Sequence, residues 1–133
     1  MRILEYLKQM EKGFGVLSTA DGKGRVNSAI YSRPHVMDDG TIAFIMLDRL
    51  THANLQENPR AAYLFIEDAG SSGKMSGVRL QLTKVREEKD SELLYTLRRV
   101  KYAGDEDEIR YLVFFKIEKV LPLIGSADPQ FTI

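Results

Sequence analysis

The residues best suited to hold a ligand are Arg49, Thr51 and His52, which stand together at the start of a helix predicted over Asp48 to Asn58. The first N–H groups of a helix lack partners and its N-terminal end carries a partial positive charge, so this turn suits an anionic group such as phosphate. Arg49 adds a guanidinium and Thr51 a hydroxyl. In the simpler alternative, Asp48 caps the helix, Arg49 is solvated and Thr51 is an ordinary turn residue.

Other site chemistries have little support in the sequence. Cysteine is absent, which excludes disulfides, thiolate metal sites and cysteine nucleophiles. The two histidines, His35 and His52, lack an Asp or Glu at metal-ligand spacing, so no metal site is expected. No G-x-S-x-G motif occurs, no pattern links a histidine to a serine, and no acid–base residue stands out as a catalyst.

The candidate turn lies between two strands that are predicted to be buried on both faces. Residues Ile42 to Leu47 and Ala61 to Ile66 are apolar throughout, whereas a strand with one wet face would alternate. A third two-faced segment, Leu112 to Phe115, belongs to a strand predicted over Arg110 to Val120. The other expected elements are strands at Val16 to Ala20, Arg25 to Ser32 and Val78 to Val85, and helices at Arg2 to Glu11 and Glu87 to Lys101.

This order of elements predicts a mainly β (α+β) fold, with about six antiparallel strands in a closed or nearly closed barrel and short flanking helices. The helices offer too little apolar surface to cover three two-faced strands. A second copy of the chain would cover them, so an isologous homodimer is expected. The alternative is that one chain buries all three strands inside a single thick core.

The composition is that of a soluble globular protein. At 133 residues, with 44% hydrophobic and 29% charged residues, the chain fits one domain over residues 1–133, of which about 121–133 form an extended tail. Lys plus Arg and Asp plus Glu number 19 each, so no net charge favours nucleic acid or an anionic membrane as a partner. No apolar run is long enough to span a bilayer and residues 1–20 lack a signal-peptide pattern, so a cytoplasmic protein is expected.

Several segments together resemble the pyridoxamine 5′-phosphate oxidase-like FMN-binding split barrels, in particular their small single-domain FMN-binding proteins. The segments are GFGVLST, RVNSAIYS, DGTIAFIML and THANLQENPRAAYLF, within about Gly13 to Arg86. The most specific part is the helix that ends in Leu55-x-x-Asn58-Pro59-Arg60 and enters an apolar strand. The resemblance implies a six-stranded split barrel, a homodimer, and FMN sites at the interface that both protomers build.

The resemblance also implies which residues bind FMN. One strand would run along the flavin, a second would lie beside its ring, and the helix start would hold the phosphate. In that order, the matching residues are Arg25, Asn27, Ser28 and Ala29, then Ile45, Met46 and Leu47, then Arg49 and Thr51, with His52 beside them. The chain departs from the family in this turn, because many members carry Ser followed by Lys here, whereas this chain has Asp48 and Arg49, and Asp48 places an acidic group close to the expected phosphate.

In function, the resemblance implies an FMN-binding flavoprotein, and more finely an FMN-dependent oxidoreductase that acts on a small molecule with an electron donor such as NAD(P)H. The residues that bind pyridoxal phosphate in the oxidase itself have no counterpart, so that particular reaction is not expected. One alternative is a non-enzymatic module or electron carrier that binds FMN, heme or a deazaflavin. Another is a dimeric interaction domain without a cofactor.

Overall fold

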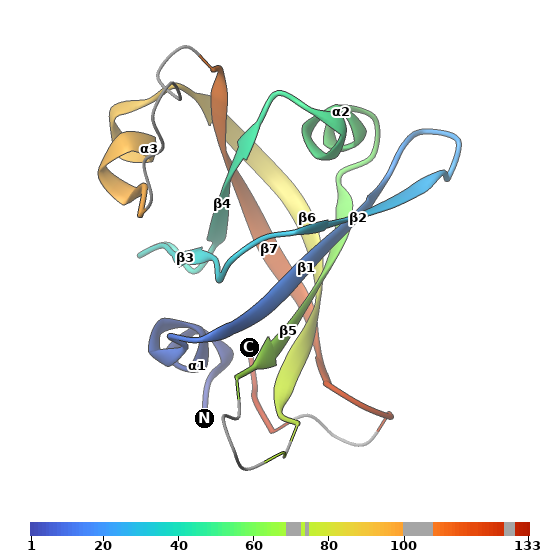
Figure 1. Ribbon diagram of the computed structural model, residues 1–133, viewed down its shortest axis with the longest axis vertical. Helices are drawn as coiled ribbons and strands as arrows, with labels where there is room; N and C mark the ends of the chain where they lie inside the picture. Colours follow the sequence, from blue (N-terminus) through green and yellow to red (C-terminus); the bar gives the residue numbers. More distant parts are fainter. Residues whose placement is uncertain (69–72, 74, 100–107, 127–129) are drawn as a thin grey trace.

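The computed structural model describes residues 1–68, 73, 75–99, 108–126 and 130–133. Its strands form one curved antiparallel sheet in the order β2-β1-β5-β6-β7-β4-β3 (Figure 1). The sheet does not close, because its end strands β2 and β3 do not pair with each other. The predicted mainly β architecture is confirmed, with a short β3 as a seventh strand. The strands are β1 (Gly13–Ala20), β2 (Val26–Ile30), β3 (His35–Val36), β4 (Ile42–Leu47), β5 (Arg60–Glu67), β6 (Gly77–Lys89) and β7 (Arg110–Pro122).

The strand–helix–strand unit predicted from the sequence is present. Strand β4 pairs with β7 from Ile42↔Phe115 to Leu47↔Arg110. Helix α2 (Leu50–Glu57) follows at once and packs against β1, β2 and β4. It stops before Pro59, because proline disfavours the helical conformation in the residue that precedes it. The other helices are α1 (Ile3–Gln9) and α3 (Glu92–Leu97), and none of the described helices is long and apolar enough to cross a membrane.

Two apolar clusters lie on opposite faces of β4 and β7. The larger cluster fills the inside of the curved sheet, where the ring of Phe44 contacts those of Tyr63 and Phe115. The smaller one lies outside, where Leu94 of α3 packs against Ala43, Leu112 and Phe114. The expectation that a second copy must cover these two strands is therefore wrong. A single helix turn of the same chain does so, because α3 brings its one fully buried leucine to the strand surface.

The predicted helix over Glu87 to Lys101 is also wrong in most of its length. Strand β6 continues to Lys89, and Glu87 to Lys89 pair with Val113 to Tyr111 of β7. The leucines whose spacing suggested the helix form a helix only in α3. Ser91 caps its first turn, because its hydroxyl accepts from the N–H of Leu94. Residues 100 and 101 lie outside the described part of the chain.

The chain ends lie side by side (Figure 1). The N–H of Ile3 donates to the carbonyl of Thr132 at 2.7 Å, and the rings of Tyr6 and Phe131 lie 4.2 Å apart. The segment predicted to be an extended tail thus returns to α1, and β7 itself runs to Pro122. This return fixes α1 across one end of the sheet.

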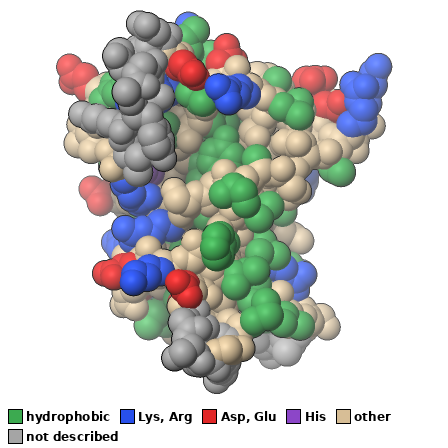
Figure 2. Space-filling view, viewed as in Figure 1, with side chains coloured by type: hydrophobic (Ala, Val, Ile, Leu, Met, Phe, Trp, Pro, Cys, Tyr) green, Lys and Arg blue, Asp and Glu red, His purple; other side chains and the backbone are tan. Residues whose placement is uncertain are grey.

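One face of the sheet stays apolar and exposed, on the outer side of β1, β2 and β5. Phe14, Val26 and Ile30 are 69%, 82% and 74% exposed, and the half-buried Leu64 lies beside them in the register. Figure 2 shows hydrophobic side chains gathered down the middle of this face. We call it the β1–β2–β5 face. Unlike β4 and β7, these strands receive no cover on this side from a described element of their own chain.

Candidate functional site

Eight of the ten residues predicted to bind a cofactor line one open groove of about 560 Å³. The groove lies between β2, β4 and the start of α2, and we call it the β2–β4 groove. A volume of this size is typical of sites for small molecules and cofactors. The eight residues are Asn27, Ser28, Ala29, Ile45, Met46, Leu47, Arg49 and Thr51.

Helix α2 begins without a side-chain cap. Its N-cap residue is Arg49, in extended conformation at φ −135° and ψ −162°, and no side chain accepts from the first turn. The alternative in which Asp48 caps the helix is therefore wrong. The first N–H groups of α2 stay open for a ligand, which is the property an anion site at a helix start requires.

The two phosphate-binding candidates have different surroundings. Thr51 is buried and its side chain lies near the hydroxyl of Tyr31. Arg49 is exposed, and its guanidinium lies 3.4 Å from a carboxylate oxygen of Glu108. Exposed ion pairs of this kind contribute little to stability, so an anionic ligand can displace Glu108 from Arg49.

The polar residues of β2 alternate between its two faces, as predicted. Ser28 lies on the outer side, where its hydroxyl pairs with that of Ser18 at 2.8 Å, while Asn27 and Ala29 are the less exposed residues. Arg25 does not line the groove. Its Nε donates to Asp21 at 2.6 Å in the β1–β2 turn. The backbone N–H of Arg25 lowers the pKa of the Asp21 carboxyl most, and the side chain of Arg25 lowers it further.

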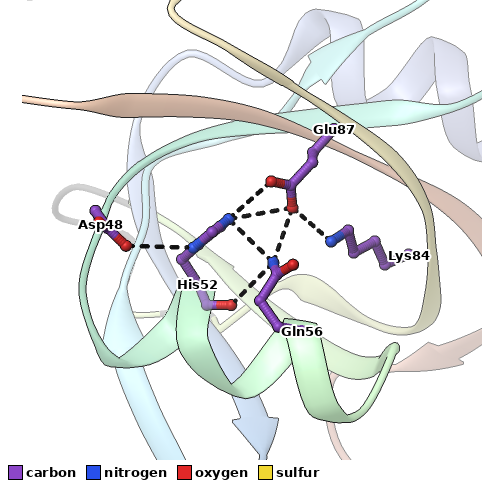
Figure 3. Close-up of polar contacts among 5 residues, drawn as sticks. All are labelled: Asp48, His52, Gln56, Lys84 and Glu87. Atoms are coloured by element: carbon purple, nitrogen blue, oxygen red, sulfur yellow. Dashed lines mark hydrogen bonds and ion pairs between the residues drawn. The ribbon is translucent and has the colours of Figure 1, made fainter.

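His52 points away from the groove into a polar network (Figure 3). Its ring is 6% exposed and stacks on Tyr111 of β7 with centroids 3.6 Å apart. Nε2 lies 2.9 Å from Oε2 of Glu87, and Nδ1 lies 3.6 Å from Oδ1 of Asp48. His52 therefore lies next to the predicted site, but its side chain does not line the groove. Among the described residues, no group of three or more His, Asp or Glu is arranged to hold a metal ion.

Glu87 is the centre of this network. Burial raises the pKa of its carboxyl, but hydrogen bonds from Lys84, His52 and Gln56 outweigh burial and lower the pKa to about 2. Sequence reasoning missed Glu87 altogether, because it lies 35 residues from His52 and was assigned to a helix. A strand that continues beyond Val85 would have placed Glu87 in the sheet, but the charged run Arg86 to Lys89 hides the alternation of apolar and polar residues that marks such a strand.

A second cavity of about 270 Å³ adjoins the groove and shares Tyr31, Ser32 and the β4 residues Ile45 to Leu47 with it. We call it the arginine cavity, because Arg33, Arg98, Arg99 and Arg110 line it together with His35. None of its described lining residues carries a carboxylate. Sequence reasoning missed this cavity because its arginines come from three separate segments that meet only in the folded sheet.

The environment of His35 makes stability depend on pH. Burial, then the charges of Arg99 and Arg33, lower the pKa of His35 from 6.5 to about 4. As the pH falls, His35 is therefore protonated in the unfolded chain before it is protonated in the folded one. The free energy of unfolding decreases as the pH falls from about 6.5 towards 4. We expect the thermal midpoint of His35→Gln to fall less than that of the wild type over this interval. Equal slopes for the two proteins in a series of melts would contradict the assignment.

The groove also has lining residues that the sequence did not single out. They are Ile30, Tyr31, Ser32 and Leu50. Alternation along β2 is a signal for Tyr31, since it continues the face of Asn27 and Ala29. Leu50 carries no such signal, because its position follows from where α2 begins rather than from any periodicity.

Comparison with known proteins gives a consistent assignment of fold. A family model described as Pyridoxamine 5′-phosphate oxidase matches residues 3–121. A solved FMN-binding protein from Syntrophomonas wolfei subsp. wolfei is 23% identical, with 84% of this chain and 77% of that chain covered and a TM-score of 0.67. HutZ, the heme storage protein from Vibrio cholerae, is 18% identical, with 92% and 95% covered and a TM-score of 0.64. A structure described as F420 reductase is 16% identical, with 87% and 94% covered and a TM-score of 0.59. No curated protein matches the chain.

Proposed function

Since the chain belongs to the pyridoxamine 5′-phosphate oxidase family, we propose that it binds FMN in the β2–β4 groove and acts as an FMN-dependent oxidoreductase on a small molecule. The observation that carries the proposal is the groove itself, which gathers eight of the ten predicted residues from β2, β4 and α2. The FMN-binding protein of the same fold supports the choice of cofactor.

The donor groups at one end of the groove fit a phosphate. Arg49 supplies a guanidinium, Thr51 a hydroxyl, and the uncapped first turn of α2 supplies backbone N–H groups. Charge-assisted bonds of this kind are shorter and stronger than neutral ones. These groups hold the phosphate end of the cofactor and thereby orient the rest of it along the groove.

The remainder of the groove fits a flat ring. Ile45, Met46 and Leu47 of β4 offer an apolar wall, and β2 lies opposite with the side chains of Asn27 and Ala29. When bound, FMN supplies the hydride and electron transfer. The chain's own residues exclude water from one side of the ring and hold its edge against the polar groups of β2.

The groove is open towards the β1–β2–β5 face. Ile30 belongs to both the groove lining and that face, and Leu50, which also lines the groove, is 56% exposed. A second copy that packs on this face would complete the wall of the groove, so the proposal includes a homodimer in which each site uses both protomers. The exposed apolar side chains support this arrangement, since monomeric proteins rarely leave large apolar patches in water.

The arginine cavity suggests the kind of reactant. It adjoins the β4 residues that would flank the flavin, and its described lining residues include four arginines and no carboxylate. Burial, then the charge of Arg33, lower the pKa of Arg99. A small anionic substrate, or a phosphorylated donor such as NAD(P)H, is the reactant that this cavity favours.

The phosphate end is tested by the affinity for FMN, measured as fluorescence quenching in a titration. We expect Arg49→Ala to weaken FMN binding about tenfold, since it removes a charge-assisted contact with the phosphate. Arg60→Ala serves as a control, because Arg60 is exposed at the start of β5 and does not line the groove. Unchanged affinity in Arg49→Ala would remove Arg49 from the site.

Absorption and kinetics separate the proposed enzyme from the alternatives. A protein purified with flavin absorption bands supports FMN, whereas a Soret band would favour heme, as the heme storage protein of the same fold suggests. Stopped-flow reduction by NADH or NADPH then distinguishes an oxidoreductase from a carrier. Rapid turnover with an added acceptor is expected, and a cofactor that stays oxidised would argue for a binding module.

A further inference from the structure

Asp48 lies where an anion site should contain no negative charge, and in the structure its carboxylate faces the ring of His52. We propose that His52 is a positioning residue for the phosphate, which keeps the carboxylate of Asp48 turned away from the β2–β4 groove. The inference rests on the proposed function, because it concerns the phosphate end of the same groove.

Asp48 stands between two residues that line the groove, Leu47 and Arg49. Its side chain is 57% exposed and gives no cap to α2. A free carboxylate at the positive end of a helix would compete with a phosphate for the same N–H groups and repel it. The position therefore needs a partner that draws the carboxylate away if a dianion is to bind there.

Two strands hold His52 in one orientation, and Figure 3 shows its contact with Glu87. Tyr111 of β7 stacks on the ring at 3.6 Å with an interplanar angle of 12°. Glu87 of β6 accepts from Nε2 at 2.9 Å, which leaves Nδ1 directed at Asp48 across 3.6 Å. Because the ring cannot turn without breaking both contacts, the Asp48 carboxylate is drawn towards the back of α2.

The two carboxylates face different nitrogens of the ring. Glu87 has other partners as well, since Lys84 Nζ lies 2.5 Å from its Oε1, and the amide of Gln56 donates to the same oxygen at 2.9 Å. Asp48 faces Nδ1 on the other side of the ring. With its carboxylate drawn towards the ring, Asp48 leaves Arg49 to face the phosphate.

A double-mutant cycle tests this role with two probes that share one ring, FMN and riboflavin, of which only FMN carries phosphate. We expect His52→Gln to weaken FMN binding about three- to tenfold relative to riboflavin, since the ring no longer holds the carboxylate of Asp48 away from the groove. Asp48→Asn should leave or raise the FMN preference, and the double variant Asp48→Asn/His52→Gln should regain that of the wild type. Non-additivity of this kind is the signature of direct coupling.

Glu87→Gln is the matched control. It removes the charge of Glu87 but keeps an oxygen that can accept from Nε2, so the ring keeps its orientation and Asp48 and Nδ1 still face each other. It should therefore lower the thermal midpoint without changing the ratio of FMN to riboflavin affinity. If His52→Gln weakens both probes equally, or if Asp48→Asn fails to restore the ratio, the role is only structural and the inference is wrong. If the wild type binds neither probe, the proposed function fails as well, and the two failures are distinguished.

Discussion

Replacing Ile30 with glutamate is expected to turn a dimer into a monomer and to abolish measurable FMN binding at micromolar protein. Ile30 is 74% exposed on the β1–β2–β5 face and lines the β2–β4 groove at the same time. In an isologous interface each residue occurs twice, so one substitution places two carboxylates in an apolar contact. Burying such charges without partners costs several kcal/mol, which corresponds to about a thousandfold or more in the dimer dissociation constant.

Sedimentation equilibrium and FMN titration on the same samples measure the two effects together. Val85→Glu is the matched control, because Val85 is 52% exposed but lies on β6 beyond the last residue that pairs with β5. The control should remain dimeric and bind FMN. A wild type that sediments as a monomer would refute the dimer, and an Ile30→Glu monomer that still binds FMN tightly would show that one chain builds the site alone.

The reason for expecting a dimer changes between sequence and structure. Apolar runs at Ile42 to Leu47, Ala61 to Ile66 and Leu112 to Phe115 suggested that a second copy must cover β4, β5 and β7. The structure covers β4 and β7 with Leu94 of α3, a residue that sequence reasoning had placed in a longer helix. The uncovered apolar surface lies on β1, β2 and β5, and in β2 its residues Val26 and Ile30 alternate with Asn27 and Ala29. The sequence showed that the residues of β2 alternate between two faces, but it did not show which face would stay uncovered.

Local patterns predicted the strand, the helix start and the helix stop on one side of the groove, because these parts are close in the chain. The β4 run, the start of α2 and the Asn58-Pro59 stop all lie within Ile42 to Pro59, and each has a period or turn signal of its own. The partners of His52 and Arg49 had no such signal. Glu87 and Glu108 reach them from β6 and from the segment before β7, so only the register of the sheet brings these charges together.

Replacing Gly15 with alanine is expected to destabilise the protein by about 3 kcal/mol and to lower its thermal midpoint by about 10 °C. A Cβ at this position would overlap the hydroxyl oxygen of Tyr63 and the carbonyl oxygen of Tyr31. The Tyr63 hydroxyl donates to that carbonyl at 3.1 Å, and burial raises the pKa of Tyr63. Displacing the ring would therefore leave two buried polar groups without their partner and strain a well-packed core.

The same substitution should also disturb the site. The carbonyl of Gly15 accepts from the N–H of Tyr31 at 2.9 Å, and Tyr31 lines both the groove and the arginine cavity. Thermal melts and FMN titration of Gly15→Ala measure both effects. Gly22→Ala is the control for a general intolerance of alanine, because a Cβ on Gly22 meets only the flexible side chain of Glu57. Adding Tyr63→Phe should recover part of the loss, since it removes one of the two oxygens that the new methyl group meets. A midpoint of Gly15→Ala within about 2 °C of the wild type would mean that β1 can move away from Tyr63, and that the end of β2 is less tightly held than its hydrogen bonds indicate.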